Sequence, residues 1–109
     1  MRQILHRLYA DFFMPSRLRE YRDFFVAALR LGYQVFSIRD FWSVLQTEGV
    51  QAGKKYLILR HDIDTDTATA KLMWLIECAL GIRSSYYSRL STLDVTFMRE
   101  IERIGGEAS

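Results

Sequence analysis

The sequence predicts an α/β protein with parallel strands and helical crossovers, and three observations support this fold class. Stretches with strand composition alternate with stretches whose apolar residues recur at helical spacing. Glycines follow the helical stretches, where helices commonly end. Half of the 109 residues are hydrophobic, which allows one domain with a core of its own.

The first half of the chain begins with an arm, residues 1–15, which mixes aromatic and basic side chains and ends at Pro15. From Ser16, expected as an N-cap, apolar residues at helical spacing predict a helix that Gly32 ends. We therefore divide the chain into an N-terminal arm, 1–15, and a domain, 16–109. Within the domain, residues 33–38 have strand composition, 40–45 predict a short amphipathic helix, 46–55 a loop, and 56–59 a compact apolar strand.

The second half repeats the alternation. A helix capped by Thr65 or Asp66 is expected to end at Gly81. Its predicted apolar face consists of Ala68, Leu72, Leu75, Ile76 and Ala79. Residues 84–90 predict a strand, and Ser91 with Asp94 resembles a capping box that starts the last helix. The predicted apolar face of that helix consists of Leu93, Phe97, Ile101 and Ile104.

Composition narrows the classes of function. The net charge is +2, and no tract rich in Lys and Arg indicates nucleic-acid binding. Cys78 is the only cysteine, which excludes an intrachain disulfide and a zinc–thiolate cluster, and we expect it to be a buried structural thiol. No apolar stretch is long enough to span a bilayer, and the N-terminus does not resemble a signal peptide, so we expect a cytoplasmic protein.

Three aspartates alternate where the apolar strand of residues 56–59 ends: Asp62, Asp64 and Asp66, beside His61. In parallel α/β folds the carboxyl ends of strands converge on one crevice, and alternate strand residues share a face. Two adjacent carboxylates repel unless a cation lies between them, so a divalent metal with a free carboxylate base would suit this spacing. Alternatively, Asp64 and Asp66 cap the next helix and Asp62 is solvated.

Two known patterns fit these residues poorly. A calcium-binding loop needs glycine and glutamate where this chain has Thr67 and Met73, so it is excluded. Haloacid-dehalogenase-like phosphatases use an apolar strand that ends in Asp-x-Asp, usually followed two residues later by threonine or valine. Asp66 stands in that place. A phosphatase using Asp62 and Asp64 therefore stays open as an alternative.

A third pattern fits better. Residues 56–90 resemble the opening of the polysaccharide deacetylase (NodB-homology, carbohydrate esterase 4-like) family, in the branch whose first motif is Arg-His-Asp-x-Asp. That motif stands at residues 60–64. Further matches are Ile76-Glu77, Gly81-Ile82 and Ser85-Tyr86-Tyr87. The resemblance extends over about residues 20–109.

The resemblance implies a deformed (β/α) barrel that hydrolyses the N-acetyl group of a sugar or polysaccharide. Asp62 would be the general base acting on a metal-bound water, and Asp64 would be a ligand of the metal, which is zinc, cobalt or nickel. His61 would orient Asp62 or support the metal pocket from behind.

Two histidines of a later motif complete the metal site in such enzymes, typically just after a Gly-x-Glu segment that residues 105–107 resemble. No histidine follows His61. We therefore expect an N-terminal fragment with an incomplete metal site, or else a non-catalytic fragment or interaction module.

Overall fold

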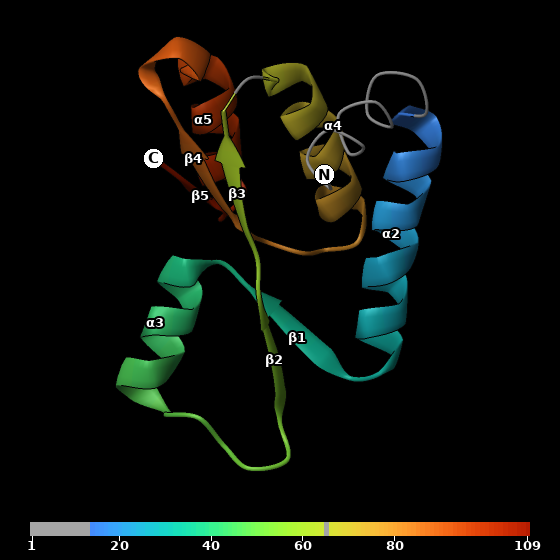
Figure 1. The fold of residues 1–109 in the computed structure, drawn as a ribbon. Helices are drawn as coiled ribbons and strands as arrows, with labels where there is room; N and C mark the ends of the chain where they lie inside the picture. The colour runs from blue at the N-terminus through green and yellow to red at the C-terminus, as the bar shows by residue number, and fades with distance from the viewer. Residues whose placement is uncertain (1–13, 65) are drawn as a thin grey trace, which may run out of the picture.

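The computed structural model describes residues 14–64 and 66–109, which form helices and short parallel strands (Figure 1). In chain order these elements are α2 (Met14–Arg30), β1 (Tyr33–Phe36), α3 (Ile38–Thr47), β2 (Lys55–Ile58), β3 (Arg60–Ile63), α4 (Thr67–Ala79), β4 (Ser85–Ser88), the 3₁₀ helix η1 (Leu90–Thr92), α5 (Val95–Arg103) and β5 (Glu107–Ala108). One sheet pairs β1 with β2, and the other has the order β3-β4-β5. All of these pairs are parallel, which confirms a mixed α/β fold. The described strands do not close into a barrel.

The two sheets meet at Leu59, the single residue between β2 and β3. Its backbone N–H donates to the carbonyl oxygen of Phe36 in the first sheet at 2.9 Å. Its carbonyl oxygen accepts from the backbone N–H of Ser85 in the second sheet at 3.0 Å. One nearly continuous extended segment, residues 55–63, therefore contributes a strand to both sheets (Figure 1).

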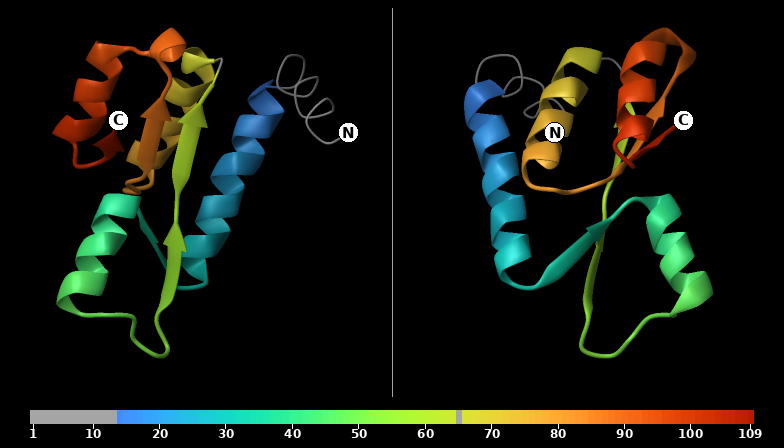
Figure 2. Two further views of the ribbon diagram at one scale, coloured as in Figure 1. Left: turned by 60° about the vertical axis from the view of Figure 1, so that its left-hand side comes forward. Right: turned by 180° about the vertical axis from the view of Figure 1, so that it is seen from behind.

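The main hydrophobic core lies between the β3-β4-β5 sheet and the helices α4 and α5, which stand in front of this sheet in the rear view (Figure 2). Its buried members are Ile63, Ala70, Tyr86, Phe97 and Ile101, with Trp74 and Ala108 packed against them. The rings of Trp74 and Phe97 meet edge to face at a centroid distance of 5.5 Å. Removing this apolar surface from water is the main force that holds the helices on the sheet.

The start and end of α2 differ in how well the sequence predicted them. The expected stop at Pro15 and N-cap at Ser16 are wrong, because both residues lie inside α2. Proline fits the first turn of a helix, where its missing N–H is not needed. The end at Gly32 is confirmed: α2 stops at Arg30, and Gly32 has a φ of +90°, which favours glycine. Residues 1–13 of the expected arm lie outside the described residues.

The following helices are capped by short polar side chains. The Ser37 side chain accepts from the backbone N–H of Asp40 at 3.0 Å, so α3 starts at Ile38 and the preceding strand is shorter than predicted. Asp66 caps α4, as one of the two predicted residues; the other, Thr65, lies outside the described residues. Asp94 is itself the cap of α5, and Ser91 lies in η1, so the predicted capping box is wrong.

The apolar face predicted for α4 is also wrong. Ala68, Leu72, Leu75 and Ala79 are exposed, whereas the buried residues of α4 are Ala70 and Glu77. In α5 the expected Phe97 and Ile101 are buried, but Leu93 is exposed. For α4 the reason is that its inward side carries a carboxylate, which hydrophobic periodicity cannot indicate.

Two further predictions concern the role of Cys78 and the absence of a membrane-spanning segment. Cys78 is half-buried, and burial raises the pKa of its thiol, which disfavours the reactive thiolate and agrees with a structural role. Among the described helices, none is both long and apolar enough to cross a membrane.

Candidate functional site

The first four residues of the Arg-His-Asp-x-Asp motif form β3 and alternate between the two faces of the sheet, and Asp64 follows directly after the strand. Asp62 pairs in register with Tyr87 of β4, and His61 pairs with Tyr86. We call the side that carries Arg60, Asp62 and Tyr87 the open face, and the side that carries His61 and Tyr86 the covered face. Tyr86 and Tyr87 are successive strand residues and so lie on opposite faces, with Tyr86 in the core.

The aspartates of the motif are exposed and each has an arginine partner. The Asp62 side chain is 53% exposed, and its Oδ1 accepts from Arg60 Nη2 at 2.8 Å. The Arg60 guanidinium also lies 5.0 Å from the centre of the Tyr87 ring, a cation–π distance. Asp64, just after the strand, is 57% exposed and lies 3.1 Å from Arg89 Nε. Each of the two carboxylates is therefore exposed to solvent and paired with one arginine, which another ligand could replace.

Asp66, the third aspartate of the series, has a different role. Its carboxylate accepts from the backbone N–H of Thr69 at 3.1 Å and from the hydroxyl of the same residue. These hydrogen bonds lower the pKa of Asp66. The capping alternative thus holds for Asp66, whereas Asp64 is paired with Arg89.

The covered face holds a buried carboxylate, Glu77 of α4, which is 1% exposed. Its Oε2 accepts from His61 Nε2 at 2.7 Å, from the Tyr86 hydroxyl at 2.9 Å and from the Tyr21 hydroxyl. Its Oε1 accepts from the Ser84 hydroxyl at 2.5 Å. We call these five residues the Glu77 network. It joins α2, β3, α4 and the start of β4 around one carboxylate.

The two tyrosines of this network keep their hydroxyl protons. Burial, followed by the charge of Glu77, raises the pKa of both Tyr21 and Tyr86 far above its usual value, so both remain protonated donors. An ionised carboxylate accepts about four hydrogen bonds, which matches its four donors. In the sequence, Glu77 was noted only as part of the Ile76-Glu77 match to the family. A signal that could have revealed its role is an acidic residue inside the apolar stretch of residues 74–80.

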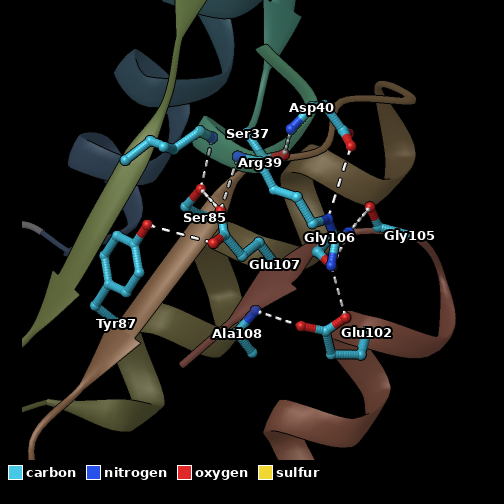
Figure 3. A network of polar contacts seen from close by, with 11 residues as sticks. Ser37, Arg39, Asp40, Ser85, Tyr87, Glu102, Gly105, Gly106, Glu107 and Ala108 are labelled. Carbon is cyan, nitrogen blue, oxygen red and sulfur yellow. Dashed lines mark hydrogen bonds and ion pairs between the residues drawn. The ribbon is translucent and has the colours of Figure 1, made fainter. Parts of the chain in front are cut away.

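A second carboxylate, Glu107 of β5, connects α3 to the sheet (Figure 3). Its Oε1 accepts from the backbone N–H of Arg39 at 3.0 Å and from the Ser85 hydroxyl at 2.6 Å. The Ser85 oxygen in turn accepts from the backbone N–H of Ile38 at 2.8 Å. This arrangement places a negative charge at the N-terminus of α3, where the helix dipole favours it.

The side chain of Arg39 completes this connection (Figure 3). It donates to Glu102 Oε1 at 2.9 Å and to the carbonyl oxygens of Gly105 and Gly106 at 3.0 and 2.8 Å. A Cβ at Gly106 would lie 2.8 Å from Ile101 Cγ2, so this position is too close to α5 for a side chain. Residues 105–107, which resemble the Gly-x-Glu segment that precedes the family's later motif, therefore have a structural role in this chain.

The described residues do not fit a complete metal centre. In residues 14–64 and 66–109, the side chains of His, Cys, Asp and Glu do not gather in a group of three or more that could hold a metal ion. Asp62 and Asp64 face arginines, and His61 is bonded to Glu77 on the covered face. His6 lies outside the described residues. Two carboxylates alone do not supply the three protein ligands of a catalytic zinc site.

No model of a known protein family matches the chain, and comparisons with curated proteins and with solved structures gave no significant match.

Proposed function

We propose that this chain carries the first motif of a polysaccharide-deacetylase-like hydrolase, which removes the N-acetyl group from a sugar or polysaccharide. Its parallel strands and helices would be the N-terminal part of a deformed (β/α) barrel. The observation that supports the proposal best is that Asp62 and His61 lie on opposite faces of β3. Asp62 is exposed on the open face, where a substrate has access, while His61 is held from behind by Glu77.

Asp62 is the proposed general base. An exposed carboxylate can take a proton from a water molecule as the water oxygen attacks the acetyl carbonyl carbon. The bond between this carbon and the sugar nitrogen then breaks, which releases acetate, and the amine requires a proton from an acid. Arg60 contacts both Asp62 and the Tyr87 ring and leaves the base exposed to solvent.

Asp64 is the proposed ligand of a zinc, cobalt or nickel ion. Because the described residues do not complete such a site, the proposal requires further ligands from outside them, and we derive no step through the metal. Asp64 is suited to this role by its place at the carboxyl end of a parallel strand.

The test is acetate release from N-acetylglucosamine oligomers by the full chain, with zinc, cobalt or nickel supplied in turn. We expect Asp62→Asn to lower the rate by about 10²–10⁴-fold, the usual contribution of a general base. Asp66→Ser, which keeps a capping side chain on α4, is the matched control and should retain the wild-type rate. Absence of acetate release by the wild type with every metal and oligomer would reject the proposal.

A second candidate is a non-catalytic module, and one observation favours it: both aspartates of the motif already have arginine partners. This candidate predicts neither acetate nor phosphate release. The phosphatase alternative instead predicts phosphate release from an aryl phosphate with magnesium, which depends on Asp62.

A further inference from the structure

We infer that Glu77 is a positioning residue: through His61 it fixes the orientation of β3 and hence the direction in which Asp62 faces. This inference rests on the proposed function for its catalytic meaning. Glu77 lies on the opposite side of the sheet from Asp62, so it would act on the base without contacting the substrate.

The first argument is how firmly His61 is held. Its Nε2 lies 2.7 Å from Glu77 Oε2 and 3.0 Å from the Tyr21 hydroxyl. Its ring also lies against that of Tyr86, with the centroids 4.5 Å apart. The Tyr21 and Tyr86 hydroxyls each donate to Glu77, so the proton on His61 Nε2 is the one that can meet the carboxylate. Glu77 and Tyr21 together therefore hold the orientation of the His61 ring.

The second argument is the geometry of a strand. Successive side chains leave opposite faces, so a rotation of β3 about its own axis moves His61 and Asp62 together. Holding the His61 ring prevents that rotation. Among residues 14–64 and 66–109, the side chain bonded to Asp62 on the open face is that of Arg60, which is itself 55% exposed. The open face alone therefore holds the base weakly, and the more rigid restraint comes from behind.

The third argument is that Glu77 links β3 to α2, α4 and β4 through one carboxylate. Its donors come from α2, β3 and the start of β4, while the residue itself belongs to α4. An apolar residue could fill the same volume, but it could not orient an imidazole or specify one arrangement of four polar partners. A buried charge that is fully hydrogen-bonded suits a positioning role, since partial loss of its partners is costly.

The experiment compares Glu77→Gln with Phe41→Ala in the full chain. Phe41 of α3 packs against Phe36 of β1 and Tyr56 of β2, with ring centroids 6.1 and 5.6 Å apart, so it holds α3 on the other sheet. Hydrogen exchange is measured for the backbone amides of β3 and of β1 and β2. We expect Glu77→Gln to accelerate exchange in β3 at least about tenfold more than in β1 and β2, and Phe41→Ala to show the reverse pattern.

Activity provides the second measurement. Glu77→Gln should lower kcat about tenfold or more with KM within about twofold, because it misplaces the base without removing a substrate contact. Phe41→Ala should keep kcat near the wild-type value. If both variants accelerate exchange equally in the two sheets, Glu77 contributes only general stability and the inference is wrong.

Two further outcomes are distinguishable. If Glu77→Gln does not fold, Tyr21→Phe removes a single hydroxyl from the network and should give the same exchange pattern with a smaller factor; uniform exchange in this variant overturns the inference. If the wild type releases no acetate, the proposed function fails, while the exchange pattern still decides whether Glu77 orients β3.

Discussion

The two faces of β3 place carboxylates in opposite circumstances. On the covered face, Glu77 is 1% exposed and accepts hydrogen bonds from four side chains. On the open face, Asp62 is 53% exposed and is bonded to one guanidinium group. Asp62 belongs to this four-residue strand, whereas Glu77 belongs to α4 and contacts the strand from its other face.

The difference shows which carboxylate serves the architecture and which is available for chemistry. A charge removed from water must be fully hydrogen-bonded, and it cannot exchange its partners without a large penalty. An exposed ion pair contributes little to stability and can be replaced by another ligand at small cost. Glu77 and Asp62 thus have different roles because their exposure to solvent differs, and the sequence alone does not predict this exposure.

The largest expected effect comes from removing the buried carboxylate. Glu77→Ala should lower the free energy of unfolding by about 3–5 kcal/mol, because it leaves His61 and three hydroxyl groups without their acceptor. The matched variant Asp62→Asn should leave this free energy nearly unchanged. Urea denaturation monitored by circular dichroism measures both. Equal losses in the two variants would contradict the distinction between the faces.

An intermediate effect is expected at alkaline pH. The pKa of Tyr21 and of Tyr86 is raised in the folded protein, chiefly by burial and then by Glu77. Their contribution to stability is therefore complete below the unfolded pKa of about 10. It is lost as the pH rises further, by up to about 1.4 kcal/mol per pH unit for each tyrosine.

Denaturation curves between pH 9 and 11 measure this loss, with the pH range chosen around the tyrosine value of about 10. Tyr21→Phe should remove about half of the slope because one titrating group remains. A slope that is the same in this variant would show that Tyr21 does not titrate differently in the folded and unfolded states.

The smallest effect concerns a buried polar residue outside the Glu77 network. Ser37 is 0% exposed and caps α3, so Ser37→Ala should destabilise the protein by about 1 kcal/mol. Ser91, which the sequence suggested as a cap, is exposed in η1, and Ser91→Ala should have no measurable effect. Thermal denaturation of the two variants compares them directly, and the opposite ranking would restore the predicted cap at Ser91.

Local signals in the sequence predicted the local structure well. Alternation of strand and helix composition predicted the parallel α/β class, and Asp66 was one of the two residues predicted to cap α4. These features depend on neighbouring residues, such as a capping side chain and the N–H three positions later. The start of α5 was predicted less accurately, because the sequence offers both Ser91 and Asp94 as capping residues.

The covered face could not be predicted in the same way. Hydrophobic periodicity placed Leu72 and Leu75 in the core, but both are exposed, and Glu77 is buried instead. One of the hydrogen-bond donors to Glu77 is Tyr21, which lies 56 residues away in the sequence and is adjacent only in the folded protein. The same applies to Glu107, whose partner Arg39 belongs to the first sheet's helix. These hydrogen bonds join residues that are far apart in the sequence, so no local sequence pattern predicts them.

Leu59 has a consequence for how the chain folds. It bonds to Phe36 on one sheet and to Ser85 on the other, so β1, the segment 55–63 and β4 must come together around one residue. Each of these parallel pairings closes a loop that contains a helix, and the entropy of loop closure is lost before the pairing is complete. Because the shared segment 55–63 contributes a strand to each sheet, we expect the two sheets to assemble together around this segment and not as two separate lobes.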